Sequence, residues 1–387
     1  MVTTFLLGMF CCNLTFLRWC APYLPNGHQD FIIYYMSGRL LRQGQAAALY
    51  NPDVQYRSQL EFTHVPNRKR AIPFNHPPFE ALLFVPLAML DFFPAYLLWD
   101  VMNLMMLGAS AMLLRQLPGI REMPPRLLAL SCAAFPPIAI GMIQGQDIFL
   151  LLLLMVLALL AMNRGDDVVS GAWLAAGLFR PHMILPLLVL LAFRRWRILL
   201  GFLPVAVALA GISAMIAGWR WPLAYLHFVL QVERERGSSF GPHQVPNLRG
   251  LIADLPGLHE SSLLVVLLIT AASLAVYGLA LRRIRDRRDS PNYYFCLAIT
   301  ATILVSFHAL WYDFTLLLPV VLFLVVSFMR EEVREVPAIL LLLLVFLFLA
   351  PLYIDLELNG HIFWLGLIPL VLFLRLLRAP APAAEPA

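Results

Sequence analysis

Long apolar segments with hardly any charge recur along the 387 residues of this chain, and they constrain its fold more than any other feature. A helix that crosses a membrane needs about 20 mostly apolar residues. We identify about a dozen such segments, at residues 4–20, 95–114, 127–143, 147–163, 168–179, 181–193, 198–218, 261–281, 292–307, 314–329, 338–352 and 362–377. The sequence therefore predicts an all-α polytopic membrane protein.

The composition agrees with this prediction and excludes most soluble classes. Hydrophobic residues make up 61% of the chain and charged residues 13%, whereas a soluble domain has about 45–50% and about 25%. The net charge of +5 does not indicate nucleic-acid binding, because the basic residues occur in short clusters between apolar segments. The 5 cysteines show neither a disulfide framework nor a metal-binding spacing.

The distribution of arginine predicts the orientation in the membrane. More than half of the 28 basic residues fall in short loops on one side, with clusters at residues 194–197 and 282–288. Cytoplasmic loops carry such an excess. We therefore expect both termini in the cytoplasm and two large outer loops, at residues 21–94 and 219–260. One membrane domain would span residues 1–378, followed by a disordered Pro/Ala tail at 379–387.

Residues 168–193 admit two interpretations, one kinked helix or two short helices that meet at Arg180-Pro181-His182. A single helix would reverse every later segment and place the arginine cluster at 282–288 outside, against the charge rule. We therefore favour two helices. An ionisable residue at such a break indicates a site, because a membrane admits irregular backbone only where protein or a watery cavity receives it.

The first outer loop carries the first candidates for a functional site. Asp30 precedes FIIYYMSGRLLR, which contains Tyr34 and has the spacing of an amphipathic helix at the membrane surface. Asp30 is either the N-cap of this helix or a functional carboxylate. Further along, the prolines of Phe74-Asn-His-Pro-Pro hold Asn75 and His76 in an extended or turn conformation. From the residues alone, two interpretations of His76 are equally good: it is part of a functional site, or it is a loop residue without a role.

Other polar residues stand at the outer ends of later segments. Gln146 and Asp147 either cap the fourth segment or face the same cavity as Asp30. Arg180 either pairs with an acidic residue, such as Asp30 or Asp147, or binds a lipid phosphate, which a guanidinium holds in a bidentate way. The remaining candidates are His182 beside Arg180, Asn247 in the second outer loop, and His308, Trp311 and Asp313 after the segment 292–307.

Taken in order, these residues form a series of short motifs. They are Asp30 with Gly44 and Tyr50, Phe74-Asn-His-Pro-Pro-Phe79, Gly145-Gln-Asp147, Arg180-Pro181 with Arg194-Arg-Trp-Arg197, Asn247, and Ser306-Phe-His-Ala-Leu-Trp-Tyr-Asp313. The series resembles glycosyltransferase family 87, once grouped as a domain of unknown function. Its best-known members are mycobacterial polyprenol-phosphate-mannose-dependent α-1,2-mannosyltransferases. They have the GT-C fold, a multi-span helical bundle with its active site on the outer face.

The resemblance implies a GT-C-type bundle of about 12 transmembrane helices, with amphipathic helices in the first outer loop. It implies transfer of a sugar, mannose in the best-known members, from a polyprenyl-phosphate donor to an acceptor hydroxyl with inversion. Asp30 would be the base, and Arg180 and His308 would bind the phosphate. The expected residues for binding the rest of the substrates are Tyr34, Asn75, His76, Gln146, Asp147, His182, Asn247, Trp311 and Asp313. We expect no metal and no cofactor besides the lipid-linked donor, because that donor carries a single phosphate and no DxD-type cluster occurs in an outer loop.

The expected partners are the polyprenyl-phosphate-linked sugar, a lipid or glycan acceptor and membrane lipids, and no nucleic acid. The preference for arginine over lysine and the apolar richness favour a bacterial cytoplasmic membrane. A secondary transporter or lipid-linked sugar flippase is the main alternative, but transporters concentrate polar residues near the bilayer midplane. Here most candidates stand at outer ends. The second alternative is a non-catalytic membrane scaffold, which would need neither Asp30 nor His308.

Overall fold

The computed structural model describes residues 2–63, 70–235, 241–255, 262–286, 290–329 and 338–378. The regular structure of these residues is helical, and they contain no strand, as the apolar segments predict. The α-helices are α1 (Val2–Cys20), α2 (Phe31–Arg42), α3 (Pro52–Leu60), α4 (Pro78–Phe84), α5 (Phe92–Leu114), α6 (Pro125–Ala134), α7 (Pro136–Gln144), α8 (Ile148–Asn163), α9 (Asp167–Ala176), α10 (Pro181–Arg194), α11 (Ile198–Ala217), α12 (Trp221–Glu235), α13 (Leu248–Ala253), α14 (Leu263–Asp286), α15 (Pro291–Val305), α16 (Leu318–Met329), α17 (Ala338–Phe348), α18 (Ala350–Leu358) and α19 (Leu367–Arg378). The predicted tail at 379–387 and residues 287–289 of the arginine cluster lie outside the described residues.

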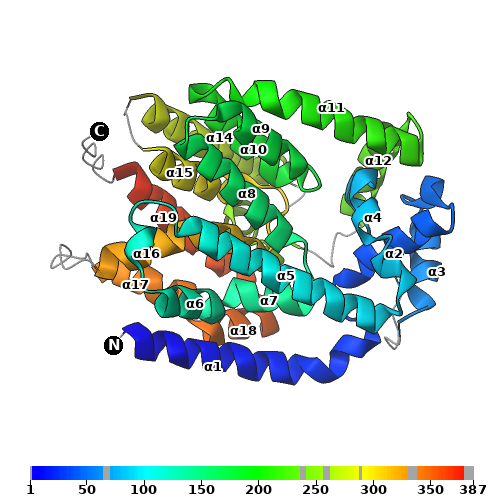
Figure 1. The fold of residues 1–387 in the computed structure, drawn as a ribbon, viewed down its shortest axis with the longest axis horizontal. Coiled ribbons are helices and arrows are strands. Elements are labelled where there is room, and N and C mark those ends of the chain that lie inside the picture. Colours follow the sequence, from blue (N-terminus) through cyan, green and yellow to red (C-terminus); the bar gives the residue numbers. More distant parts are fainter. Residues whose placement is uncertain are drawn as a thin grey trace.

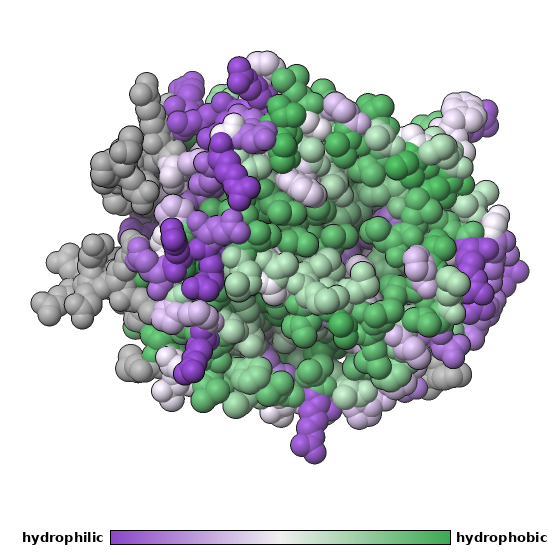
Figure 2. All heavy atoms as spheres, in the orientation of Figure 1, coloured by the Kyte–Doolittle hydropathy of each residue, from purple (hydrophilic) through white to green (hydrophobic). Residues whose placement is uncertain are grey.

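The surface of the bundle is that of a membrane protein. Helix α1 begins and α19 ends on one side of the molecule, whereas α2, α3 and α4 gather on the opposite side (Figure 1). On the face that Figure 2 shows, apolar residues form a broad band between hydrophilic residues at these two ends. The exposed side chains of Leu104 in α5, Val207 in α11 and Leu274 in α14 belong to long apolar helices. Such a band is suited to the hydrocarbon core of a bilayer.

Fewer helices than predicted are long and apolar enough to cross a membrane. Within the described residues, 4 segments qualify, namely Val2–Arg42, Phe92–Leu114, Ile198–Ala217 and Leu263–Arg285. The number rises to 6 if the bent pairs α6–α7 and α17–α18 each count as one span. The other predicted segments are helical, but breaks in the chain limit them to 10–17 residues. The positions of the predicted helices are therefore right, and the number of about 12 full spans is too high by this measure.

Residues 168–193 form two helices, as the arginine distribution predicts. Helix α9 ends at Ala176, and α10 begins at Pro181. Proline is tolerated in the first turn of a helix, where its missing N–H has no intrahelical partner. Arg180 thus lies in the break between the two helices, and its side chain is buried.

The helix after Asp30 is buried, which corrects the expectation of a helix at the membrane surface. Its sequence is helical as predicted, but most of its residues are enclosed by protein, including Phe31, Tyr34 and Gly38. They form a second hydrophobic core with α4 and α5, in which Phe84 and Trp99 take part. The sequence periodicity shows that a helix has an apolar face, but not that α4 and α5 cover the remaining faces.

Candidate active site

The turn between α7 and α8 presents Gln146 to the interior. Gly145 has a left-handed φ of 60°, and a Cβ at this position would lie 2.8 Å from Cβ of Phe31. Only glycine meets both conditions without displacing the chain. From α5, Trp99 Nε1 donates a hydrogen bond to the carbonyl of Gly145, and Asn103 Nδ2 donates one to the carbonyl of Gln146, both at 3.0 Å. Helix α5 therefore fixes the backbone of this turn.

Asp30 stands at the start of α2, but its side chain does not cap the helix. Instead, Gln146 Nε2 donates a hydrogen bond to Oδ2 of Asp30 at 2.7 Å. The backbone N–H of Asp30 donates to Oε1 of Gln144 at 3.0 Å. Of the two interpretations of Asp30, the geometry favours a carboxylate that shares a site with Gln146.

Asp30 lines a cavity of about 370 Å³ that has both polar and apolar walls. Gln144 contributes an amide, and Trp311 and Tyr312 contribute aromatic rings. Trp311 is held against Tyr353 with the ring centroids 5.9 Å apart. The cavity thus brings two predicted residues, Asp30 and Trp311, to one space.

The cavity of Asp30 adjoins an apolar groove of about 550 Å³ between α1 and α18. Both spaces are lined by Phe16 and Trp19 from α1 and by Ile354 and Leu358 from α18. Helix α1 belongs to a segment that is long and apolar enough to cross a membrane. The groove on α1 and the cavity of Asp30 therefore share a wall of apolar side chains.

Arg180 is the centre of a buried network of ion pairs. Its Nε donates a hydrogen bond to Oδ1 of Asp147, and its Nη1 donates to Oδ1 of Asp313, both at 2.7 Å. Its Nη2 donates to Oε1 of Gln146 at 2.5 Å. The guanidinium thus uses its fork of donors on three protein acceptors. Pairing with Asp147 is one of the two interpretations given above, and contact with a lipid phosphate stays a prediction.

Tyr34 joins the same network from α2. Its hydroxyl oxygen lies 2.9 Å from Oε1 of Gln146 and 3.1 Å from Oδ1 of Asp147, so both acceptors compete for one proton. The ring stacks on Phe84 with a centroid separation of 4.8 Å. Asp147, like Asp30, makes no side-chain cap to the helix that follows it. Gln146 contacts Asp30 directly, and Asp147 joins it through Arg180 and Tyr34. That both residues face the cavity of Asp30 stays a prediction, because neither lines it.

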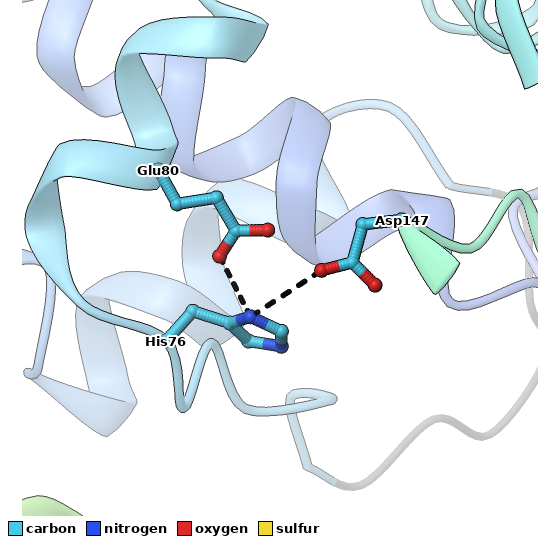
Figure 3. Close-up of side chains that lie close together, drawn as sticks. All are labelled: His76, Glu80 and Asp147. Carbon is cyan, nitrogen blue, oxygen red and sulfur yellow. Dashed lines mark ion pairs between the residues drawn. The ribbon is translucent and has the colours of Figure 1, made fainter. Parts of the chain in front are cut away.

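His76 contacts two carboxyl groups in the interior (Figure 3). Its Nδ1 lies 2.6 Å from Oε2 of Glu80 and 3.8 Å from Oδ2 of Asp147. Burial lowers the pKa of His76 to about 4, although the charge of Asp147 opposes this shift. Burial also raises the pKa of Glu80 well above its usual value, and the charge of Asp147 acts in the same direction. Both shifts favour the uncharged forms of His76 and Glu80.

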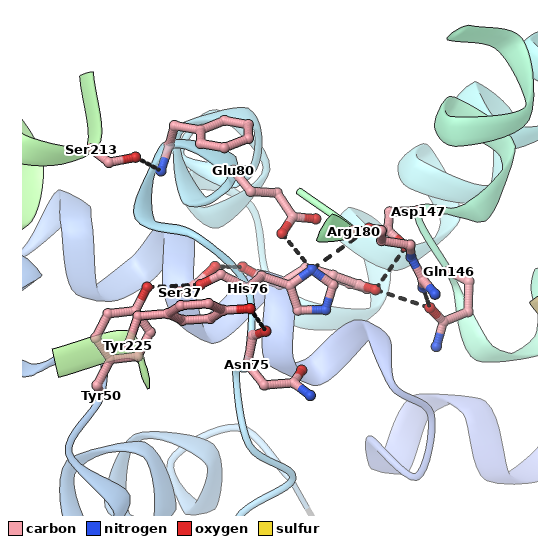
Figure 4. Close-up of polar contacts among 12 residues, drawn as sticks. Ser37, Tyr50, Asn75, His76, Glu80, Gln146, Asp147, Arg180, Ser213 and Tyr225 are labelled. Atoms are coloured by element: carbon pink, nitrogen blue, oxygen red, sulfur yellow. Dashed lines mark hydrogen bonds and ion pairs between the residues drawn. The ribbon is translucent and has the colours of Figure 1, made fainter. Parts of the chain in front are cut away.

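The segment that carries His76 is fastened through its backbone (Figure 4). The hydroxyl of Tyr50 donates a hydrogen bond to the carbonyl of His76 at 2.8 Å. The hydroxyl of Tyr225 from α12 donates one to the carbonyl of Asn75 at 3.2 Å. The segments 21–94 and 219–260 therefore both contribute to the position of His76, and Asn75 takes part through its main chain.

His182 and His308 lie next to each other, with ring centroids 6.1 Å apart and the rings nearly perpendicular. His308 is half-buried. Asn247 caps α13 by accepting a hydrogen bond from the N–H of Arg249 at 2.9 Å, and its Nδ2 donates to the carbonyl of Ser306 at 2.5 Å. Asn247 thus fixes the chain just before His308, which is a structural task that its sequence motif did not reveal.

Three residues of the site were not singled out by the sequence analysis. Glu80 follows His76 by four residues, and this spacing at the start of a helix is the signal that could have identified it. Tyr312 lies under Arg180, with the guanidinium carbon 5.7 Å from its ring centroid. Gln144 holds the backbone of Asp30 and stands two residues before Gln146. Tyr312 lies inside the motif Ser306–Asp313, and Gln144 directly precedes the motif Gly145–Asp147.

These observations define a polytopic helical membrane protein with a buried acidic site and an apolar groove between α1 and α18. The family model of glycosyltransferase family 87 matches residues 74–307, which is more than half of the chain. The chain therefore belongs to glycosyltransferase family 87, and the protein is a membrane glycosyltransferase that uses a sugar donor and an acceptor. No protein of curated function and no solved structure matches it. Family membership sets aside the transporter and scaffold alternatives.

Proposed function

We propose that this glycosyltransferase takes its sugar from a polyprenyl-phosphate donor and transfers it to an acceptor hydroxyl on the outer face of a bacterial cytoplasmic membrane. One observation carries the proposal, namely that the cavity of Asp30 adjoins the apolar groove between α1 and α18. A polyprenyl chain gains free energy by leaving water for such a groove, whereas a nucleotide sugar has no apolar tail to occupy it.

Asp30 is the proposed base of the reaction. The oxygen of the acceptor hydroxyl forms a bond to the anomeric carbon while the bond from that carbon to the phosphate oxygen breaks. The electron pair of the broken bond leaves with the polyprenyl phosphate, and the hydroxyl proton passes to Asp30. Such a direct displacement inverts the anomeric centre. The hydrogen bond from Gln146 supports this role, because a base must be held in one orientation toward the acceptor.

His308 is the proposed contact of the departing phosphate, since a half-buried imidazole can offset negative charge when protonated. For Arg180 we propose an indirect role. Its Nη2 holds Oε1 of Gln146, and Gln146 in turn holds Asp30. Trp311 lines the cavity and is the proposed aromatic contact of the sugar. Mannose is the proposed sugar because the motifs resemble those of mannosyltransferases in the family.

The donor class is tested by reconstituted transfer. The protein is purified into liposomes and given radiolabelled mannose either as the polyprenyl phosphate or as a nucleotide sugar, with total host lipids and glycans as acceptors. We expect label to move only from the polyprenyl phosphate, with release of the unlabelled lipid phosphate. Transfer from the nucleotide sugar in the absence of any lipid-linked sugar would contradict the proposal.

A further inference from the structure

We propose that His76, Glu80 and Asp147 bind a divalent transition-metal ion, and that Zn²⁺ is the ion that fits best. The three side chains come from the loop before α4, from α4 and from the turn before α8 (Figure 3). One ligand atom from each lies within 4.8 Å of the other two. One imidazole nitrogen with two carboxylate oxygens is a ligand set that proteins use for zinc, with a water in the fourth position.

The atoms that point into this cluster lack ordinary hydrogen bonds. Within the described residues, both carboxyl oxygens of Glu80, Oδ2 of Asp147 and Nδ1 of His76 have no partner with hydrogen-bond geometry. The side chain of Glu80 is completely buried. Buried carboxylates are normally hydrogen-bonded, paired or bound to a metal. One such atom from each of the three residues lies within 4.8 Å of the other two, and this convergence indicates a ligand there.

The balance of charge around the cluster also favours a cation. Glu80, Asp147 and Asp313 supply three carboxylates, and Arg180 supplies one guanidinium to Asp147 and Asp313. If these four groups are ionised and His76 is neutral, two negative charges remain without a partner. Such an excess is costly in a low-dielectric interior. A divalent ion bound at His76 would balance these two negative charges. Without an ion, protonation of the carboxylates must balance them.

The ligand types and their spacing select the ion. Ca²⁺ and Mg²⁺ prefer oxygen ligands alone, whereas imidazole suits zinc and its neighbours in the first transition row. Two ligand atoms at about 2.1 Å from a tetrahedral Zn²⁺ stand about 3.4 Å apart. The observed separations from Nδ1 of His76 are 2.6 Å to Glu80 and 3.8 Å to Asp147. Small movements of two side chains therefore complete the geometry.

The ion would act as a positioning centre. Asp147 binds Arg180 through Oδ1 and would bind the ion through Oδ2. Its neighbour Gln146 holds Asp30. A metal ion would thus tie the first outer loop to the turn that orients the proposed base, without contact with the donor phosphate. From the sequence we expect no metal, because the donor carries a single phosphate and no DxD-type cluster occurs in an outer loop. A positioning ion that does not touch the phosphate differs from that expectation but leaves the transfer chemistry unchanged.

The metal content of the purified protein tests this inference. The full chain is purified without chelators, saturated with Zn²⁺, freed of excess ion and analysed by elemental mass spectrometry. We expect about one Zn²⁺ per chain, as a single four-coordinate site requires. In Glu80→Gln the retained Zn²⁺ should fall at least about tenfold, since even the loss of an outer-shell partner costs that much affinity. The matched control is Glu61→Gln, which alters a surface carboxylate paired with Arg39 and should keep the ion.

A second measurement guards against a variant that fails to fold. The thermal unfolding midpoint of the wild type should rise when Zn²⁺ is added to chelator-treated protein and should not change in Glu80→Gln or His76→Asn. Retention of no Zn²⁺ by the wild type, or of equal Zn²⁺ by Glu80→Gln, would overturn the inference and leave a shared proton as the balancing charge. The result does not depend on the proposed donor, because no transfer is measured.

Discussion

Gln146 donates a hydrogen bond from Nε2 to Oδ2 of Asp30 at 2.7 Å, across 116 residues of sequence. The oxygen of the same amide accepts hydrogen bonds from Nη2 of Arg180 and from the hydroxyl of Tyr34. The orientation of the Asp30 carboxylate therefore depends on a buried network that reaches α10. Three of the predictions below follow from this arrangement.

Replacing Gln146 should slow catalysis more than it weakens binding. In Gln146→Ala the carboxylate of Asp30 loses the donor that orients it. Misplacement of a reacting group by about 1 Å costs about 10²-fold in rate. We expect kcat for sugar transfer to fall by about this factor, with little change in KM for the donor. The control is Gln116→Ala, which removes an exposed amide that contacts Arg164. Equal kcat values for the wild type and Gln146→Ala would show that Asp30 needs no such support.

Removing the charge of Arg180 should destabilise the fold itself. Arg180→Leu leaves Asp147 and Asp313 buried without their cation. Breaking a buried ion pair in this way costs about 3–5 kcal/mol. We expect a clear fall in the thermal unfolding midpoint in detergent. Arg220→Leu, at an exposed arginine, should leave the midpoint unchanged. If Arg180 served only to bind a lipid phosphate, Arg180→Leu would unfold like the wild type and only KM for the donor would rise.

The turn that carries Gln146 should tolerate glycine alone. In Gly145→Ala the new Cβ meets Phe31 at 2.8 Å and Tyr96 at 3.0 Å, in a left-handed backbone conformation. We expect a loss of about 1–3 kcal/mol of stability together with reduced transfer. Gly108→Ala in α5 is a matched control, since a Cβ there meets no atom within 4 Å. Thermal unfolding of both variants in the same detergent distinguishes them, and equal midpoints would contradict this account of the turn.

Much of the helical architecture could be predicted from the sequence, for a simple physical reason. Lipid forces backbone polar groups to pair within a helix, so apolar segments report helices directly. The arginine distribution also separated residues 168–193 into two helices, and Arg180 lies at their break. The number of full spans could not be predicted in the same way. Hydropathy does not reveal bends such as the 62° bend between α6 and α7.

The candidate site could be predicted in part. Polar residues in apolar surroundings of a membrane protein seldom lack a partner. This rule draws attention to Asp30, Gln146, Asp147 and Arg180. Their pairing depends on which helices pack together, and this is not encoded in local spacing. The same limit explains why α2 was placed at the membrane surface, although it is buried.

A substitution in the groove between α1 and α18 should weaken the binding only of donors with a long lipid chain. Trp19 lines both the groove and the cavity of Asp30. In Trp19→Ala the chain of the donor loses apolar contact area, and we expect KM for a long-chain polyprenyl-phosphate sugar to rise about tenfold. KM for a short-chain analogue should change little. Trp196→Ala alters another exposed tryptophan and serves as the control. An equal rise for both chain lengths would place the effect on the sugar and not on the lipid.

The central claim is that Asp30 is the base of the transferase, and the most direct measurement compares Asp30→Asn with the wild type in reconstituted liposomes. The substitution keeps the size of the side chain and removes its capacity to take a proton. With labelled polyprenyl-phosphate mannose as donor, we predict that kcat falls by about 10²–10⁴-fold, while insertion and unfolding temperature are kept. Asp53→Asn, at an exposed carboxylate in the same segment 21–94, should transfer like the wild type. Wild-type transfer by Asp30→Asn would contradict the claim and reduce Asp30 to a residue at the start of a helix.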